Sequence, residues 1–277
     1  MLEEALLLMM YYEKDGEIIN FMDAKKRFGQ NFLVDQNILD KICNEINASS
    51  DDLIIEIGPG KGALTSKLKE KGANLLCYEI DTDLKPYLSK YTDDKTKIIF
   101  KDILEANIIE DIKDIKYNNL LIVGNLPYYI TTPIIKKLIK LKLPVSEMIF
   151  MVQEEVADRF SAKENTKDYS AITLYLKYYY NVTKQFRVSK KSFSPIPKVE
   201  SAIIKLTRRD NKPIVNEDKY FKLLEDSFRM KRKTLKNNLS EYDFNRINKI
   251  LKEYNYSDLV RAEELPEEVF LAICNDL

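Results

Sequence analysis

The sequence predicts an α/β fold, in which helices cover an open and mostly parallel sheet, followed by a small all-helical region. An apolar run at residues 53–57 leads into a turn with three glycines, and residues 63–71 then have the composition of a helix. Polar side chains recur at the ends of apolar runs in a regular step along the first half of the chain. Beyond residue 213, every segment has a helical pattern.

The glycine turn is Gly58-Pro59-Gly60-Lys61-Gly62, and its pattern distinguishes three kinds of nucleotide site. A P-loop requires Ser or Thr after Lys61, and the dinucleotide fingerprint places its third glycine one position beyond Gly62. The pattern Glu-x-Gly-x-Gly-x-Gly that begins at Glu56 instead resembles the S-adenosylmethionine methyltransferases. From this stretch alone, a strand-to-helix turn that binds no ligand is the alternative.

Acidic or amide side chains follow four successive apolar runs at a constant step of 23 residues, at Glu56, Glu79, Asp102 and Asn125. A strand, a loop, a helix and a return loop need about that many residues, so the step indicates successive βα units. Right-handed crossovers bring the four strand ends to one edge of the sheet, where open α/β sheets bind ligands. The sequence therefore predicts one site built from these four positions.

Composition limits the chemistry that this site can use. The chain has 277 residues, of which 45% are hydrophobic and 32% charged, and no histidine, which excludes Ser-His-Asp and Cys-His catalysis and histidine metal sites. The net charge is zero, so a nucleic-acid surface must be a local patch. The three cysteines have no metal or redox spacing and suit a reducing compartment, and no apolar run approaches the roughly 18 residues of a membrane span. We expect a cytoplasmic protein without a metal.

The segment before the glycine turn has two parts. Residues 1–22 contain a short apolar run without a basic start, which does not indicate a secretion signal; a short amphipathic helix, a frayed tail and residues added during cloning stay open. Residues 25–35 combine three basic residues, a glycine and two amides, and form either a solvated loop or a loop that closes over the ligand. Residues 36–46 are amphipathic, and Asp35 is the expected N-cap of that helix.

Asn125 is followed by Leu126-Pro127-Tyr128, a turn stiffened by its proline. Proline restricts Leu126 to an extended backbone and fixes its own φ, so the carbonyls and the Asn125 side chain can converge on one point. Tyr128 is then presented by a rigid turn. A turn without function is the alternative.

The later elements follow from the same patterns. We expect helices at 133–141, 154–160 and 172–180, and strands at 148–152, 182–188 and 201–206. Tyr175, Tyr178 and Tyr179 have helical spacing, which favours core packing over base stacking. Residues 190–199 form a stiff proline loop that carries one aromatic among three lysines, and residues 208–213 have the composition of a linker. Residues 229–236 include five basic side chains, which form either a solvated face or a phosphate-contacting patch.

Several of these motifs together resemble one family, the small-subunit ribosomal RNA adenine dimethyltransferases (dimethyladenosine transferases). The resemblance is carried by residues 26–33, 56–62, 125–128, 192–199 and 232–239. It implies a seven-stranded, Rossmann-like S-adenosylmethionine methyltransferase domain at 23–207 and a small all-helical RNA-binding domain at 213–277, with residues 1–22 as an extension outside the match. It also implies monomeric action on the rRNA of the assembling 30S subunit, at two adjacent adenines.

The resemblance implies roles at matching positions. For S-adenosylmethionine these are Asn31, Leu33, Glu56, Gly58, Gly60, Glu79, Ile80, Asp102, Ile103 and Asn125. For catalysis they are Asn125, Leu126, Pro127, Tyr128 and Phe193. For RNA they are Lys25, Lys26, Arg27, Lys190, Lys191, Lys198, Arg229, Lys231, Arg232, Lys233 and Lys236.

The expected chemistry follows from the weak nucleophilicity of the adenine N6 amine. The Asn125 side-chain oxygen and the Leu126 carbonyl would each accept one N6 hydrogen, so that the nitrogen lone pair faces the sulfonium methyl group. Positioning of this kind lowers a barrier by about 7–11 kcal/mol at best and needs no strong general base. The base must leave its stack, and Tyr128 and Phe193 would enclose it. Two transfers yield N6,N6-dimethyladenine.

Three other functions stay open at this point. A large-subunit rRNA adenine methyltransferase of the antibiotic-resistance type would use the same chemistry, although Leu126 and residues 232–239 favour the small subunit. A DNA adenine methyltransferase usually has two prolines between its Asn and Tyr, where this chain has one. A non-catalytic ribosome-assembly or RNA-binding factor on the same fold is the alternative from another class.

Overall fold

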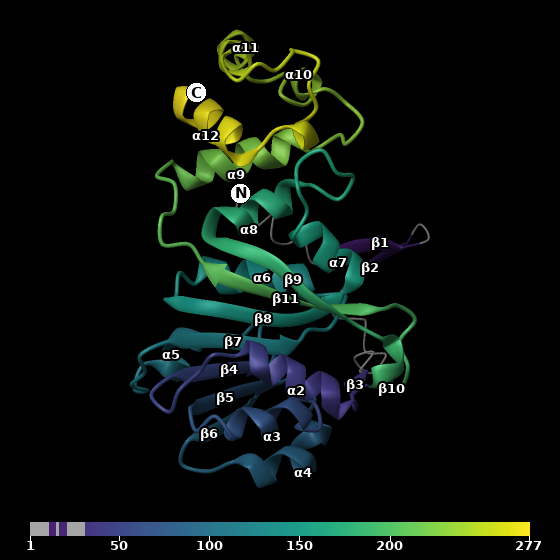
Figure 1. Ribbon diagram of the computed structural model, residues 1–277, viewed down its shortest axis with the longest axis vertical. Helices are drawn as coiled ribbons and strands as arrows, with labels where there is room; N and C mark the ends of the chain where they lie inside the picture. Colours follow the sequence, from purple (N-terminus) through teal and green to yellow (C-terminus); the bar gives the residue numbers. More distant parts are fainter. Residues whose placement is uncertain (1–10, 15–16, 21–30) are drawn as a thin grey trace.

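The computed structural model describes residues 11–14, 17–20 and 31–277 (Figure 1). Strands β1 (Tyr11–Lys14) and β2 (Glu17–Asn20) pair antiparallel, a pairing that the sequence did not predict. The apolar run at 5–10 lies outside the described residues. So do the predicted RNA-binding residues Lys25, Lys26 and Arg27.

A seven-stranded sheet forms the centre of the molecule, as predicted, in the order β6-β5-β4-β7-β8-β11-β9. Strands β4 to β8 are parallel, whereas β11 pairs antiparallel with both β8 and β9. The chain winds outward in both directions from β4, so the carboxyl ends of β4 and β7 flank the switch point where such sheets bind ligands. The strands are β4 (Leu53–Ile57), β5 (Asn74–Glu79), β6 (Thr96–Phe100), β7 (Leu120–Asn125), β8 (Val145–Gln153), β9 (Tyr180–Val188) and β11 (Ser201–Arg208).

Helices cover both faces of this sheet, and each face has its own apolar core. One face packs against α2 (Gln36–Glu45) and α3 (Ala63–Lys69). The other packs against α5 (Ile108–Ile112), α6 (Thr131–Lys140), α7 (Glu154–Phe160) and α8 (Ala171–Tyr179), while a short α4 (Lys85–Leu88) follows β5. Asp35 caps α2 as predicted, because its carboxylate accepts the N–H groups of Asn37 and Ile38.

The C-terminal helices gather at one end of the sheet around a third core (Figure 1). They are α9 (Glu217–Ser227), α10 (Leu235–Asn238), α11 (Phe244–Glu253) and α12 (Glu267–Asp276). Tyr178 of α8 joins this core and packs on Tyr220 and Phe221, which confirms core packing for the tyrosine-rich helix. None of the helices within the described residues is long and apolar enough to cross a membrane.

Helix α8 contributes to two cores, because Leu176 packs in the sheet core and Leu174 in the helical core. Arg209, just past β11, adds a polar link, since its guanidinium donates to both carboxylate oxygens of Glu267 at 2.9 Å and to the Lys177 carbonyl at 2.6 Å. The predicted boundaries at residues 207 and 213 therefore stay predictions.

Candidate active site

A cavity of about 430 Å³ opens at the carboxyl ends of the central strands. It brings together most of the predicted cofactor and catalytic residues, namely Asn31, Gly58, Gly60, Glu79, Ile80, Asp102, Ile103, Asn125, Leu126, Pro127 and Tyr128. Its lining also includes residues to which no sequence pattern assigned a role, among them Phe32, Lys101, Tyr129, Ile130 and Gln153. The 23-residue step therefore brings Glu79, Asp102 and Asn125 into one site.

The glycine turn forms one wall of this cavity with bare backbone. Gly58 has φ +70°, a left-handed conformation that favours glycine, and its N–H donates to the Tyr78 carbonyl at 2.9 Å. A Cβ at Gly58 would lie 3.3 Å from the Asn125 carbonyl oxygen. The ends of β4 and β7 are thus in close backbone contact, and a side chain at Gly58 would separate them.

Glu79 ends β5 as a buried carboxylate with both oxygens engaged. One oxygen accepts the Gly60 N–H at 3.0 Å, and the other accepts the Asp81 N–H at 2.9 Å. Burial raises the pKa of Glu79, and these backbone hydrogen bonds oppose that rise. Because each carboxylate oxygen has two lone pairs, each retains one acceptor position for a ligand.

Asp102 lies beyond β6, at the third position of the step. Its Oδ1 accepts the Leu104 N–H at 2.8 Å. Within residues 31–277, no hydrogen bond reaches its other oxygen, Oδ2, and the side chain is only partly buried. The neighbouring Ile103 is buried and apolar, so this part of the cavity combines one acceptor with an apolar surface.

Asn125 ends β7 with its amide held in one orientation. Its Nδ2 donates to the Asn31 carbonyl at 3.2 Å, and among the described residues no group donates to its Oδ1. The next residue, Leu126, donates its N–H to the Met151 carbonyl at 3.2 Å, and no donor in the described part of the chain reaches its own carbonyl oxygen. Two neighbouring acceptors are therefore available at this strand end.

Tyr128 completes this end of the cavity. Its hydroxyl lies 2.6 Å from Ser201 Oγ, and burial raises its pKa. Ser201 is buried in β11, directly opposite Gln153 of β8. The hydrogen bond to Ser201 fixes the far end of the Tyr128 side chain, as the adjacent Pro127 fixes its backbone.

Comparison with known proteins identifies the family. A family model described as ribosomal RNA adenine dimethylase matches residues 21–277. The chain belongs to this family.

Curated family members and a solved structure agree with this assignment. The Mycoplasmopsis pulmonis protein "Ribosomal RNA small subunit methyltransferase A" is 44% identical over 260 residues, which cover 92% of this chain and 100% of that protein. The protein of that name from Streptococcus thermophilus is 41% identical over 266 residues, 91% of each chain. The crystal structure of a dimethyladenosine transferase from Plasmodium falciparum is 26% identical, with a TM-score of 0.72 over 87% of this chain and 95% of that one. The large-subunit enzyme "23S rRNA methyltransferase ErmE" has the same fold, with a TM-score of 0.69 at 24% identity, over 89% and 99% of the two chains.

Three residues that the family resemblance assigned to the site do not line the main cavity. Glu56 is fully buried behind the glycine turn, where it accepts the Thr65 hydroxyl at 2.7 Å, and burial raises its pKa to about 7. Glu56 and Leu33 line a separate cavity of about 250 Å³ that shares the glycine turn. Phe193 is only 2% exposed, because β10 (Phe193–Ser194) pairs with β3 (Phe32–Leu33) and turns the ring into the core. The expectation that Phe193 stacks on a base does not fit this conformation.

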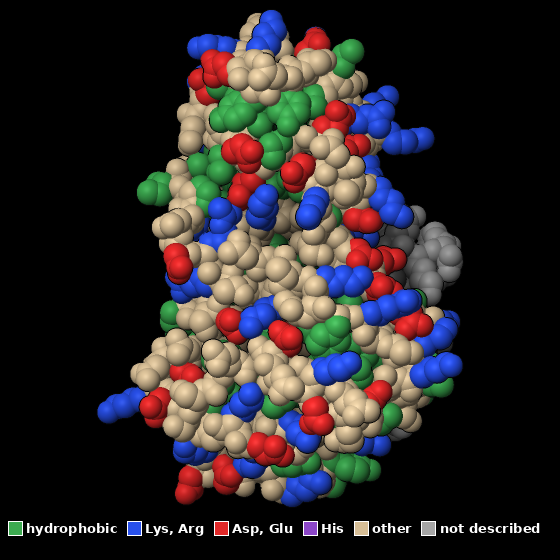
Figure 2. Space-filling model, in the orientation of Figure 1, with side chains coloured by type: hydrophobic (Ala, Val, Ile, Leu, Met, Phe, Trp, Pro, Cys, Tyr) green, Lys and Arg blue, Asp and Glu red, His purple; other side chains and the backbone are tan. Residues whose placement is uncertain are grey.

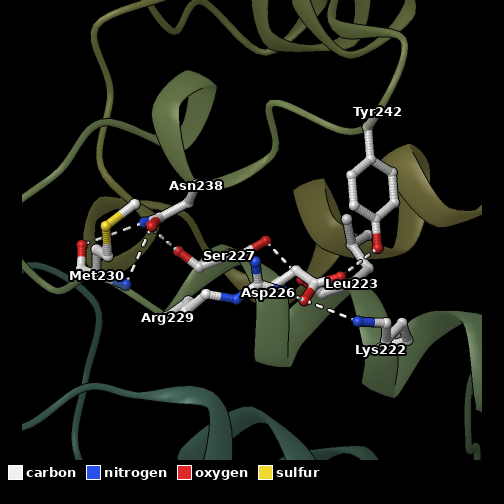
Figure 3. A network of polar contacts seen from close by, with 8 residues as sticks. All are labelled: Lys222, Leu223, Asp226, Ser227, Arg229, Met230, Asn238 and Tyr242. Carbon is white, nitrogen blue, oxygen red and sulfur yellow. Dashed lines mark hydrogen bonds and ion pairs between the residues drawn. The ribbon is translucent and has the colours of Figure 1, made fainter.

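The basic residues predicted to contact RNA are not equivalent. Figure 3 shows that Arg229 and Lys222 both face the buried carboxylate of Asp226, which also accepts the Tyr242 hydroxyl. Lys231 donates to the Lys167 carbonyl, and Lys236 lies over the Phe244 ring. By contrast, no partner for the side chains of Arg232 and Lys233 occurs in the part of the chain that the structure describes, and the same holds for Lys190, Lys191 and Lys198.

Residues 229–234, between α9 and α10, form a turn rich in Lys and Arg, which we call the basic turn. The side-chain amide of Asn238 stabilises it. Asn238 of α10 accepts the Met230 N–H at 3.0 Å and donates to the carbonyls of Ser227 and Met230 at 2.7 and 3.2 Å (Figure 3). On the face of the molecule in Figure 2, Lys and Arg side chains are interspersed with Asp and Glu. A local basic turn, rather than a broad positive field, is consistent with the zero net charge.

Proposed function

We propose that the chain transfers two methyl groups from S-adenosylmethionine to the N6 atom of adenines in small-subunit ribosomal RNA. Family membership supports an rRNA adenine dimethyltransferase, and the curated relatives carry a small-subunit name. The observation that carries the proposal is the pair of acceptors at the end of β7, Asn125 Oδ1 and the Leu126 carbonyl, on the wall of a cavity built from the glycine turn.

The cavity residues suit S-adenosylmethionine. The bare backbone at Gly58 and Gly60 allows close approach of the methionine part, and Asn31 lies on the same wall. Glu79 retains acceptor positions for the two ribose hydroxyls, and Asp102 Oδ2 can accept from the adenine amino group. S-adenosylmethionine, when bound, supplies an electrophilic methyl group on a sulfonium centre.

Asn125 and Leu126 would hold the N6 amine of the target. Each of their oxygens accepts one N6 hydrogen, which draws the nitrogen toward tetrahedral geometry and directs its lone pair away from the ring. The bond from Asn125 Nδ2 to the Asn31 carbonyl fixes the orientation of the amide and leaves Oδ1 available as an acceptor. This positioning needs no histidine, and the chain has none.

Tyr128 would stack on the extruded base, with a contribution of about 1–3 kcal/mol. Its hydroxyl is bound to Ser201, so the ring costs little entropy to hold in place. Phe193 would have to leave its packing site to contact the same base. We therefore assign the stacking role to Tyr128.

The helical C-terminal region would bind the rRNA through the turn between α9 and α10. Arg232 and Lys233 are the residues of that turn best able to contact phosphate, because the neighbouring cations already have partners in the protein. Lys190, Lys191 and Lys198, whose side chains have no partner among the described residues, form a second candidate contact. The proposed partner is an assembling small subunit in the cytoplasm, bound by a monomer.

The rival functions differ in substrate or in catalysis. A large-subunit target would require methylation of 23S rRNA, and the likeness to "23S rRNA methyltransferase ErmE" shows the fold alone. A non-catalytic assembly factor would have no use for two available acceptors on the wall of a cofactor-sized cavity.

Methyl transfer to defined particles tests the proposal. Purified protein and radiolabelled S-adenosylmethionine would be incubated with naked 16S rRNA, partly assembled 30S particles, mature 30S subunits and 23S rRNA, and the nucleosides analysed by mass spectrometry. We expect N6,N6-dimethyladenosine in the small-subunit RNA and none in 23S rRNA. Methylation of 23S rRNA alone would favour the first rival, and binding without methylation would favour the second.

A further inference from the structure

Gln153 has an amide on the cavity wall that the proposed mechanism does not use. It is the last residue of β8, directly after the apolar run 148–152. Gln153 occupies the N-cap position of α7, yet its side chain makes no capping hydrogen bond. No other described residue forms a hydrogen bond with the Gln153 side chain, so both its donor and its acceptor are available.

The sheet order assigns Gln153 to the target side of the cavity. Most of the predicted cofactor-binding positions lie at the ends of β4, β5 and β6, whereas β8 lies on the opposite side of β7. Asn125 is in register with Met151, two residues before Gln153. Gln153 also pairs with Ser201, whose hydroxyl holds Tyr128. Gln153 thus lies beside the Asn125–Tyr128 turn, on the wall of the same cavity.

The backbone of Gln153 is fixed by its neighbours. The antiparallel pairing of β8 with β11 extends to Gln153, and the next residue, Glu154, donates its N–H to the Glu200 carbonyl at 3.0 Å. Only side-chain torsions then have to be fixed when the amide meets a ligand. A polar group held in this way, without a partner inside the protein, is suited to reading the edge of a base.

We infer that Gln153 is a specificity-determining residue that donates its Nε2–H to a ring nitrogen of the target adenine. This inference rests on the proposed function. When Asn125 and Leu126 accept the two N6 hydrogens, adenine still presents acceptors on both sides of N6, at N1 and N7. Guanine has an oxygen in place of N6 and a hydrogen on N1. On its Watson–Crick edge the two acceptors of Asn125 and Leu126 would therefore face an acceptor, and the Gln153 donor would face a donor.

Deaza analogues separate the two ring positions. Small-subunit particles would be reconstituted with rRNA that carries adenine, 7-deazaadenine or 1-deazaadenine at the methylated position. Single-turnover methylation by the wild type and by Gln153→Met, which keeps the length of the side chain but not the donor, forms a double-mutant cycle. The cycle cancels the electronic effect of each analogue on N6, because both enzymes experience it.

We expect the wild type to lose about tenfold more rate than Gln153→Met on one of the two analogues, since one hydrogen bond is at stake. The sensitive analogue identifies the recognised atom, N7 or N1. The matched control is Gln185→Met, because Gln185 lies on β9 with its amide bonded to Thr183 and outside both cavities. It should behave as the wild type.

Equal losses for wild type and Gln153→Met on both analogues would overturn the inference, provided that the wild type methylates unmodified adenine. Failure of the wild type on unmodified adenine would instead overturn the proposed function, and this inference with it. Calorimetry of S-adenosylmethionine binding and thermal unfolding of both variants separate these results from a folding defect. For both Gln153→Met and Gln185→Met, we expect the S-adenosylmethionine affinity and the unfolding temperature of the wild type.

Discussion

The cavity and the basic turn of the C-terminal region use their polar side chains in opposite ways. At the cavity, Asn125 and Asp102 each use one side-chain atom in a hydrogen bond to the backbone, and the second side-chain atom of each stays available. In the basic turn, Arg229 forms an ion pair with the buried carboxylate of Asp226. Arg232 and Lys233 of the same turn have no partner among the described residues, so only part of the basic run is available to a ligand. Four predictions test this contrast, in order of decreasing change.

Replacing Asn125 by alanine should reduce the methylation rate at least a hundredfold, or about 2.7 kcal/mol of barrier, because the acceptor acts on the reacting nitrogen. Affinity for S-adenosylmethionine should change little, since other residues bind most of that ligand. Single-turnover kinetics and calorimetry measure the two effects. Asn181→Ala, at an exposed position of β9, is the control and should keep the normal rate.

Asp226→Asn should destabilise the helical C-terminal region by about 1–3 kcal/mol, because Lys222 and Arg229 lose their counter-ion. Burial opposes ionisation of Asp226, but hydrogen bonds from Tyr242 and Lys222 and the charge of Arg229 outweigh it and lower the pKa. A lowered pKa of an acid stabilises the fold above the unfolded-state pKa, and that stability is lost as the pH falls through the folded-state pKa.

Urea denaturation from pH 7 down to pH 3 measures this contribution. The wild type should lose more stability on acidification than Asp226→Asn, and the exposed neighbour Glu225→Gln should follow the wild type. Equal acid sensitivity in all three proteins would mean that Asp226 does not anchor the basic turn.

Glu79→Ala should weaken S-adenosylmethionine binding about tenfold, because two buried ribose hydroxyls would lose their acceptor. The substitution also removes the acceptor for the Gly60 and Asp81 N–H groups, so the glycine turn loses support as well. Isothermal calorimetry gives the affinity. The control is Glu105→Ala, an exposed carboxylate near Asp102; a Glu79→Ala affinity equal to that of the control would remove Glu79 from the site.

The joint substitution of Arg232 and Lys233 by alanine should weaken RNA binding a few-fold. It should also flatten the dependence of log K on log salt by up to about 0.9 per lost contact, or less on unpaired RNA. Arg229→Ala should change stability more than salt dependence, because its charge already pairs with Asp226. If Arg229→Ala flattens the slope as much as the double variant, then Arg229 contacts RNA phosphate despite its ion pair with Asp226. The proposed distinction between paired and available cations would then be incorrect.

Sequence reasoning succeeded where local rules decide the outcome. The 23-residue step predicted successive βα units because strand, loop and helix lengths are narrowly distributed, and it brought Glu79, Asp102 and Asn125 into one cavity. The cap at Asp35 and helix α7 at Glu154–Phe160 also depend on neighbouring residues alone, and both are confirmed.

Sequence patterns do not predict side-chain positions that depend on contacts between distant parts of the chain. Phe193 is turned into the core by its pairing with Leu33, a contact between distant parts of the chain. Glu56 belongs to the step, but its side chain turns toward Thr65 and the second cavity. Gln153 was missed although it also follows an apolar run, because it lies outside the 23-residue step. A rule that accepts every polar residue at a strand end would have found it.

Asn125→Asp and Asn125→Leu together test whether acceptor oxygens at the end of β7 hold the target amine. The two variants have similar size, and only aspartate offers an acceptor. Aspartate cannot donate to the Asn31 carbonyl, so partial activity is expected rather than full activity. In single-turnover methylation of small-subunit particles, we expect Asn125→Asp to react at least about tenfold faster than Asn125→Leu. Equal rates for the two variants, with both folded and both binding S-adenosylmethionine normally, would mean that residue 125 does not act as an acceptor for the target amine.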